Sequence, residues 1–203
     1  MREEVRDLSP SNGATLAVRS ITTETEIPDL HVFMEHQFDA AAGGRPTLHI
    51  GAAVMRPFSA GSVMLRSRNP LDPPVIRLNL LADERDQARL LEAVKLANKV
   101  ARTPPLSGLI DWDAAEARDV PDDETLMAMI RERVSIFYHA CRTVRMGDPL
   151  DVEAVVDWAG HVHGIKNLRV VDASILPEMI AVATNPTVIM VAERIAKMIR
   201  TGG

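Results

Sequence analysis

The sequence has a single cysteine, Cys141, among its 203 residues, so it can form neither an internal disulfide nor a cysteine cage for zinc. It also lacks any apolar run close to the roughly 20 residues that span a bilayer. Its first ten residues, MREEVRDLSP, contain no apolar core of the kind found in a secretory signal. These absences predict a cytoplasmic protein that has no membrane partner.

Basic clusters are missing as well. The 23 Lys and Arg residues are outnumbered by 28 Asp and Glu residues, which gives a formal net charge of −5. Proteins that bind nucleic acids or anionic membranes usually carry a basic stripe, so we expect no nucleic-acid partner. The apolar fraction of 46% and the charged fraction of 25% are typical of a folded soluble domain.

Several catalytic motifs are also absent from the sequence. It contains no G-x-S-x-G nucleophile elbow, no P-loop and no G-x-G-x-x-G dinucleotide fingerprint. His161 and His163 are spaced so that one strand face would present both to a metal, but Gly160 and Gly164 favour a turn at this point. We therefore expect no metal, and a metal site at these two histidines is the lesser alternative.

The pattern of apolar and turn residues predicts an α+β fold. Leu90, Leu91 and Val94 fall on one face of the clearest helix, for which Asp83 is the expected cap. The predicted helices cover residues 83–102, 123–134 and a last segment that begins near Pro186. The predicted strands cover residues 30–34, 48–55, 62–66, 75–80, 155–157 and 168–172.

Three ordered segments near the C-terminus carry the strongest signal. They are Tyr138-His139 followed by Thr143-x-Arg145-Met146-Gly147, then His163-Gly164 followed by Leu168-Arg169-Val170-Val171-Asp172-Ala173-Ser174, and finally Asn185-Pro186-Thr187 followed by Ala192-Glu193. Together they resemble the C-terminal signature of the glucose–methanol–choline (GMC) family of flavin-dependent alcohol oxidases and dehydrogenases, over roughly residues 50–200. Three positions depart from the family pattern. Ala140 stands where the family often has Pro, Arg142 stands where it normally has Gly, and Pro186 follows Asn185 directly, so the N-x-P order is shifted by one.

This resemblance implies a division of the chain into two parts. Residues 1–136 would form part of a substrate-binding domain with a mixed or antiparallel sheet flanked by helices. Residues 137–203 would form a catalytic segment whose strand and helix complete an FAD-binding domain. The glycine fingerprint of that domain is missing, so we expect a partner chain to supply the N-terminal FAD-binding half.

The resemblance also implies two catalytic residues. His139 matches the family histidine that faces the flavin and takes the hydroxyl proton of the substrate, a task that suits a side chain with a pKa near neutrality. Asn185 matches the residue that hydrogen-bonds the substrate oxygen. The alternative for Asn185 is a helix N-cap, because Asn followed by Pro186 is typical of a helix start.

The remaining implied sites concern the cofactor, FAD. Asp172 and Ala173 match residues that meet the flavin phosphates or ribityl chain, although a strand-end Asp that caps a turn is an equal alternative. Pro186, Thr187 and Val188 begin the last helix, whose N-terminus would stabilise negative charge on the reduced flavin. We expect the N–H groups of Thr187 and Val188 to be the donors.

The sequence therefore predicts a C-terminal subunit or fragment of an FAD-dependent alcohol oxidase or dehydrogenase that acts on a small-molecule alcohol. A non-catalytic binding module is one alternative, and a lyase that cleaves cyanohydrins with the same fold is another. We expect Cys141 to be a core thiol. Arg142 and Arg145 would pair with nearby carboxylates or, alternatively, steer an acidic substrate.

Overall fold

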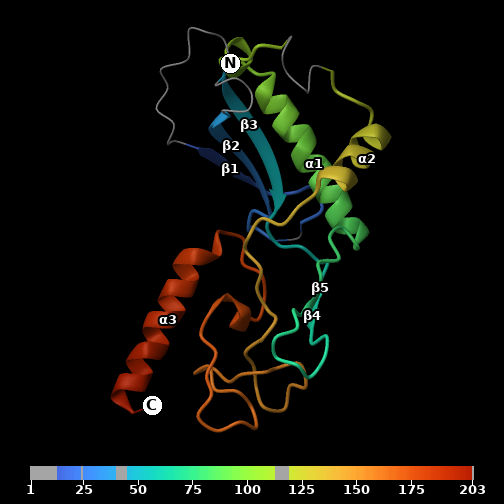
Figure 1. Ribbon diagram of the computed structural model, residues 1–203. Coiled ribbons are helices and arrows are strands. Elements are labelled where there is room, and N and C mark those ends of the chain that lie inside the picture. The colour runs from blue at the N-terminus through green and yellow to red at the C-terminus, as the bar shows by residue number, and fades with distance from the viewer. Residues whose placement is uncertain (1–12, 24, 40–44, 113–118, 203) are drawn as a thin grey trace. The chain divides into compact units, whose positions relative to one another are not determined.

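The computed structural model describes residues 13–23, 25–39, 45–112 and 119–202 (Figure 1). The chain divides into two compact units, the first made of Met1–Ser59 with Leu81–Val134 and the second of Ala60–Leu80 with Ser135–Gly203. The second unit thus takes residues 60–80 in addition to the C-terminal segment. The assignment of residues 1–136 to substrate binding and 137–203 to catalysis stays a prediction.

The first unit is built on an antiparallel sheet with the strand order β1-β2-β3. Its strands are β1 (Ala14–Val18), β2 (Leu30–Asp39) and β3 (Arg45–Val54). The helix α1 (Glu84–Ala101) packs against β2 and β3. The predicted strands at 30–34 and 48–55 are confirmed, and the antiparallel pairing with packed helices confirms the α+β class.

Both helices of this unit begin at aspartate caps. The Asp83 carboxylate accepts a hydrogen bond from Arg85 N, as predicted, and Asp122 accepts one from Thr125 N at the start of α2 (Asp123–Arg133). Side-chain hydrogen bonds from Arg85 lower the pKa of Asp83 to about 2. The two helices share a core of Leu90, Leu126 and Ile130, and a short 3-10 turn, η2 (Leu106–Gly108), follows α1.

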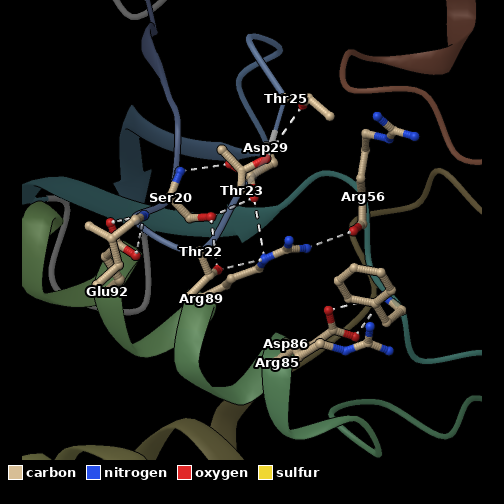
Figure 2. A network of polar contacts seen from close by, with 12 residues as sticks. Ser20, Thr22, Thr23, Thr25, Asp29, Arg56, Arg85, Asp86, Arg89 and Glu92 are labelled. Carbon is tan, nitrogen blue, oxygen red and sulfur yellow. Dashed lines mark hydrogen bonds and ion pairs between the residues drawn. The ribbon is translucent and has the colours of Figure 1, made fainter.

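A buried ion pair joins α1 to the segment between β1 and β2 (Figure 2). Arg89 Nε lies 3.3 Å from Asp29 Oδ2, and both side chains are more than nine-tenths buried. Ser20 donates to Asp29 through both its backbone N–H and its hydroxyl, at 2.7 Å each. Because these bonds satisfy the carboxylate on several sides, its charge is tolerated in the interior.

A second buried carboxylate, Asp86, holds the point where the chain leaves the first unit. It accepts hydrogen bonds from Phe58 N at 3.0 Å and Ser59 N at 2.7 Å. The Ser59 hydroxyl in turn accepts from Asp83 N, where the chain returns. Hydrogen bonds at the start of α1 therefore hold the chain both where it leaves the first unit, at Phe58 and Ser59, and where it returns, at Asp83.

The second unit contains little regular structure. A short antiparallel hairpin pairs β4 (Ser62–Met64) with β5 (Val75–Arg77), and α3 (Thr184–Thr201) ends the chain, preceded by the 3-10 turn η3 (Ala173–Ile175). None of the helices in the described ranges is both long and apolar enough to cross a membrane.

The predicted strands at 155–157 and 168–172 are wrong. The structure has only isolated bridges there, which join Val156 to Met146 and Val162, and His161 to Arg169. The chain turns too often for a ladder to extend. At Gly160, where φ is +79°, an added Cβ would lie 2.6 Å from the Val170 carbonyl oxygen, so this turn requires glycine.

The buried pair yields a stability prediction. Arg89→Met leaves the Asp29 carboxylate buried without its counter-charge, which should lower the free energy of unfolding by about 3–5 kcal/mol. Arg85→Met is the matched control on the same helix, because Arg85 is largely exposed, and it should have a far smaller effect. Urea unfolding of the two variants tests this, and equal losses would contradict the assigned role of the Arg89 pair.

Candidate functional site

One apolar cluster joins the three sequence segments that carry the family signature. Val156, Ile175 and Ile195 are almost completely buried and pack together. They come from the 155–157 segment, from η3 and from α3. Partly buried side chains surround them from all three signature segments, namely Val144, Met146, Val170, Val171 and Val191, and Val162 directly precedes the second segment.

Backbone hydrogen bonds align the first two signature segments. Val144 N donates to Ser174 O at 3.0 Å, and Met146 N donates to Ile175 O at 2.9 Å. Gly147 N continues the pattern by donating to Val156 O. Segments about 30 residues apart in sequence therefore lie side by side, although no strand ladder forms between them.

His139 is half-buried and has two contacts that orient its ring. Its Nδ1 lies 3.2 Å from the hydroxyl oxygen of Thr184, the first residue of α3. Its ring meets the ring of Phe137 edge-on, with centroids 5.2 Å apart. Tyr138 and Arg142, on either side in sequence, both adopt left-handed backbone conformations, with φ of 57° and 73°. Such conformations cluster at functional sites, where the surrounding structure holds them.

The helix α3 begins earlier than the predicted start near Pro186, at Thr184. Its cap is Ala183, whose side chain makes no capping hydrogen bond. Thr187 is then the fourth helical residue, so regular helix geometry directs its N–H to the Ala183 carbonyl. The free N–H groups of this turn belong instead to Thr184 and Asn185, while Pro186 has none to satisfy. Cofactor contact by Pro186, Thr187 and Val188 stays a prediction.

The same register settles one alternative for Asn185. Because Ala183 is the cap, Asn185 lies at the second helical position and is not an N-cap. Its side chain is exposed, and it follows directly on Thr184, which contacts His139. The structure thus brings His139 and the first turn of α3 together. The catalytic role of Asn185 stays a prediction.

Asp172 and Ala173 lie at the start of η3. The Asp172 carboxylate accepts hydrogen bonds from the backbone N–H and the hydroxyl of Ser174, so it caps the turn. This is the structural alternative that the sequence left open. Both bonds use Oδ1, and the residue is exposed. Contact of Asp172 or Ala173 with a cofactor stays a prediction.

The other histidines of this region have local partners. His161 Nδ1 lies 2.9 Å from Asp157 Oδ2, and His163 Nε2 lies 3.3 Å from the Gly147 carbonyl oxygen. Burial acts to raise the pKa of Asp157, but hydrogen bonds from His161 and Ala159 outweigh it and lower that pKa. Within the described ranges, no three His, Cys, Asp or Glu residues are grouped as a metal would need.

The two arginines of the first signature segment pair with carboxylates. Arg145 contacts Asp151 and lies 3.4 Å from Glu153, and Arg142 lies 3.6 Å from Glu153. The pairing predicted from the sequence is therefore present. Cys141 is half-buried, with its sulfur 3.9 Å from that of Met179, and burial raises the pKa of its thiol. A raised pKa disfavours the reactive thiolate.

The contact at the candidate site that sequence reasoning missed is that of Thr184 with His139. A helix start predicted near Pro186 leaves this residue outside the helix, where its side chain has no defined direction. Its position directly before Asn185 is the one signal that the sequence contains.

The GMC oxidoreductase family model matches residues 57–192, about two thirds of the chain. The chain belongs to this family, which confirms the resemblance of the signature segments. Oxygen-dependent choline dehydrogenase from Proteus mirabilis (strain HI4320) is 38% identical over 152 residues, which are 75% of this chain and 27% of that protein. The chain therefore spans about a quarter of the length of the curated relatives it matches.

Solved structures agree with this assignment. A pyridoxine 4-oxidase described as from Mesorbium loti superposes with a TM-score of 0.75 at 26% identity, over 91% of this chain and 37% of that one. A formate oxidase variant from Aspergillus oryzae RIB40, made to study FAD modification, superposes with a TM-score of 0.77 at 26% identity, over 87% of this chain and 32% of that one. FAD, the cofactor predicted from the sequence, is named with the formate oxidase and belongs to this family.

The left-handed conformation of Arg142 yields a second prediction. Arg142→Gly should be more stable than Arg142→Ala by about 1 kcal/mol, because alanine keeps a Cβ at a backbone angle that glycine adopts freely. Both changes remove the contact with Glu153 equally. The same pair of substitutions at Arg194, exposed in the middle of α3, should show the reverse order, because glycine weakens a helix. Thermal melts that rank alanine above glycine at position 142 would contradict the backbone assignment.

Proposed function

We propose that this chain supplies the catalytic histidine and the substrate-side part of an FAD-dependent alcohol oxidoreductase. The observation that carries the proposal is the contact of His139 with the first turn of α3, within a chain that belongs to the GMC oxidoreductase family. The curated relatives named as choline dehydrogenases support an alcohol as the substrate class.

The start of α3 fits a flavin. The cap residue Ala183 has no side-chain acceptor for the N–H groups of Thr184 and Asn185, and helix geometry gives these groups no partner inside the helix, so they can donate to an acceptor such as a flavin carbonyl. The helix dipole adds partial positive charge at the same end. Asp172 and Ala173 remain the residues proposed to meet the phosphates or the ribityl chain.

The proposed chemistry separates a hydride from a proton. FAD, when bound, accepts the hydride from the alcohol carbon. His139 accepts the hydroxyl proton at Nε2, since Nδ1 is engaged with Thr184, and the carbon–oxygen bond becomes a carbonyl. Asn185, exposed at the start of the same helix, hydrogen-bonds the substrate oxygen and orients it toward His139.

The FAD-binding half is proposed to lie on a partner chain or on another part of the same polypeptide. Two features support this: the chain spans 27% of its relatives' length, and α3 exposes apolar surface. Ile189, Met190 and Ile199 are each more than half exposed. Apolar patches of this kind mark interaction surfaces.

The proposed catalytic role of His139 is tested in the flavin-loaded enzyme. His139→Ala should slow anaerobic flavin reduction by an alcohol about 10²–10⁴-fold, the usual contribution of a positioned acid–base group. Asn185→Ala should cost less, because it removes one orienting hydrogen bond worth about 1–3 kcal/mol. His161→Gln is the control, since this histidine pairs with Asp157, and it should reduce flavin at the wild-type rate.

Rapid-mixing spectroscopy gives these rates. If the His139→Ala variant reduces flavin at the wild-type rate, the catalytic assignment is refuted. Cyanohydrin cleavage by an enzyme whose flavin is never bleached by alcohols would favour the lyase alternative. If neither reaction occurs in the assembled protein, the chain is a binding module.

The partner proposal makes its own prediction. The chain purified alone should show no flavin absorbance, because it lacks the glycine loop and the acidic residue that bind the dinucleotide. Co-expression with an FAD-binding half should restore the flavin spectrum. A stoichiometric flavin spectrum from the lone chain would contradict the proposed division of the cofactor site.

A further inference from the structure

Thr184 combines three properties that the proposed mechanism has not used. It is 6% exposed, it is the first residue of α3, and its hydroxyl lies 3.2 Å from His139 Nδ1. A buried hydroxyl pointing at the imidazole of a proposed base is placed to decide which ring nitrogen carries the proton.

We propose that Thr184 is a positioning residue that accepts a hydrogen bond from Nδ1–H of His139 and so keeps Nε2 free to take the substrate proton. The inference rests on the proposed function, and it adds which nitrogen acts and what holds the ring. A neutral imidazole has one N–H, so a proton at Nδ1 leaves Nε2 as the acceptor.

The same bond suits both charge states of the ring. When Nε2 takes the proton, both nitrogens become donors, and Nδ1–H goes on donating to Thr184 Oγ1. No side chain has to move during the transfer. A backbone N–H facing Nδ1 would have the opposite effect, because it would place the proton on Nε2 and block the base.

The hydroxyl is itself held in place by the fold. Thr184 starts the helix whose Val191 and Ile195 pack into the core with Val156 and Ile175. A β-branched side chain on a packed helix has few rotamers. Phe137, which packs edge-on against the ring, restricts the imidazole from its own segment.

The two segments that carry His139 and Thr184 contain few charged or titratable residues. The first turn of α3 carries no acidic residue. The segment of His139 carries Tyr138, Cys141 and Arg142, and the Arg142 guanidinium lies near Glu153. The first turn of α3 and residues 137–142 thus carry no carboxylate, and the Thr184 hydroxyl is the described partner of Nδ1.

Thr184→Val tests the inference in the flavin-loaded enzyme, because valine keeps the shape and removes the hydroxyl. We expect the flavin reduction rate to fall about 10-fold, as loss of one hydrogen bond implies, with KM nearly unchanged. The ionisation in the rate profile should move to lower pH by about one unit, because the imidazolium loses its acceptor. Thr184→Ser should retain both properties. Thr201→Val, at the other end of α3, is the control.

A readout independent of activity is the tautomer of His139. Nitrogen chemical shifts of labelled histidine in the flavin-free enzyme should report Nδ1–H in wild type and a shift toward Nε2–H in Thr184→Val. His139→Gln identifies the signal by its loss. If the valine variant fails to fold, the comparison uses Thr184→Ala, which should be about 10-fold slower than Thr184→Ser.

The outcomes separate the two proposals. A Thr184→Val enzyme with the wild-type rate, pH profile and tautomer would overturn the role of Thr184, even if His139→Gln is inactive. If His139→Gln reduces flavin at the wild-type rate, the proposed function itself fails.

Discussion

The packing of Val156, Ile175 and Ile195 is the constraint on which the second unit depends. Apart from η3, the described stretch 135–183 forms no helix or strand, so backbone ladders cannot hold it in place. Each of the three residues comes from a different segment, and burying them together draws the segments onto α3. The contact between His139 and Thr184 exists because that core fixes where α3 begins relative to the loop that carries the histidine.

In the first unit, buried charged side chains hold the loops in place. Asp29 and Arg89 are buried as an ion pair, and Asp86 accepts hydrogen bonds from the loop at Phe58 and Ser59. Buried charges cost more than apolar packing unless every partner is in place. Their value here is that they fix loop ends with definite geometry, which an apolar contact does not do.

Elements with strong periodicity were predictable from the sequence. α1 was predictable from its apolar face and the Asp83 cap, and β2 and β3 from their apolar runs. The 155–157 and 168–172 segments were not, because short apolar runs look the same whether they form a ladder or single bridges around a turn such as Gly160. At the site, family motifs predict roles for His139 and Asn185. Thr184 required the structure, since a helix start predicted near Pro186 left its side chain without a defined direction toward the imidazole.

Neutral His139 is proposed to take the hydroxyl proton of an alcohol. The most direct measurement is the pH dependence of anaerobic flavin reduction, with wild type and His139→Gln side by side in the assembled enzyme. The rate in wild type should fall with decreasing pH through one ionisation, because the protonated ring cannot act as a base. This ionisation should vanish in the variant. The same profile in both proteins would contradict the account.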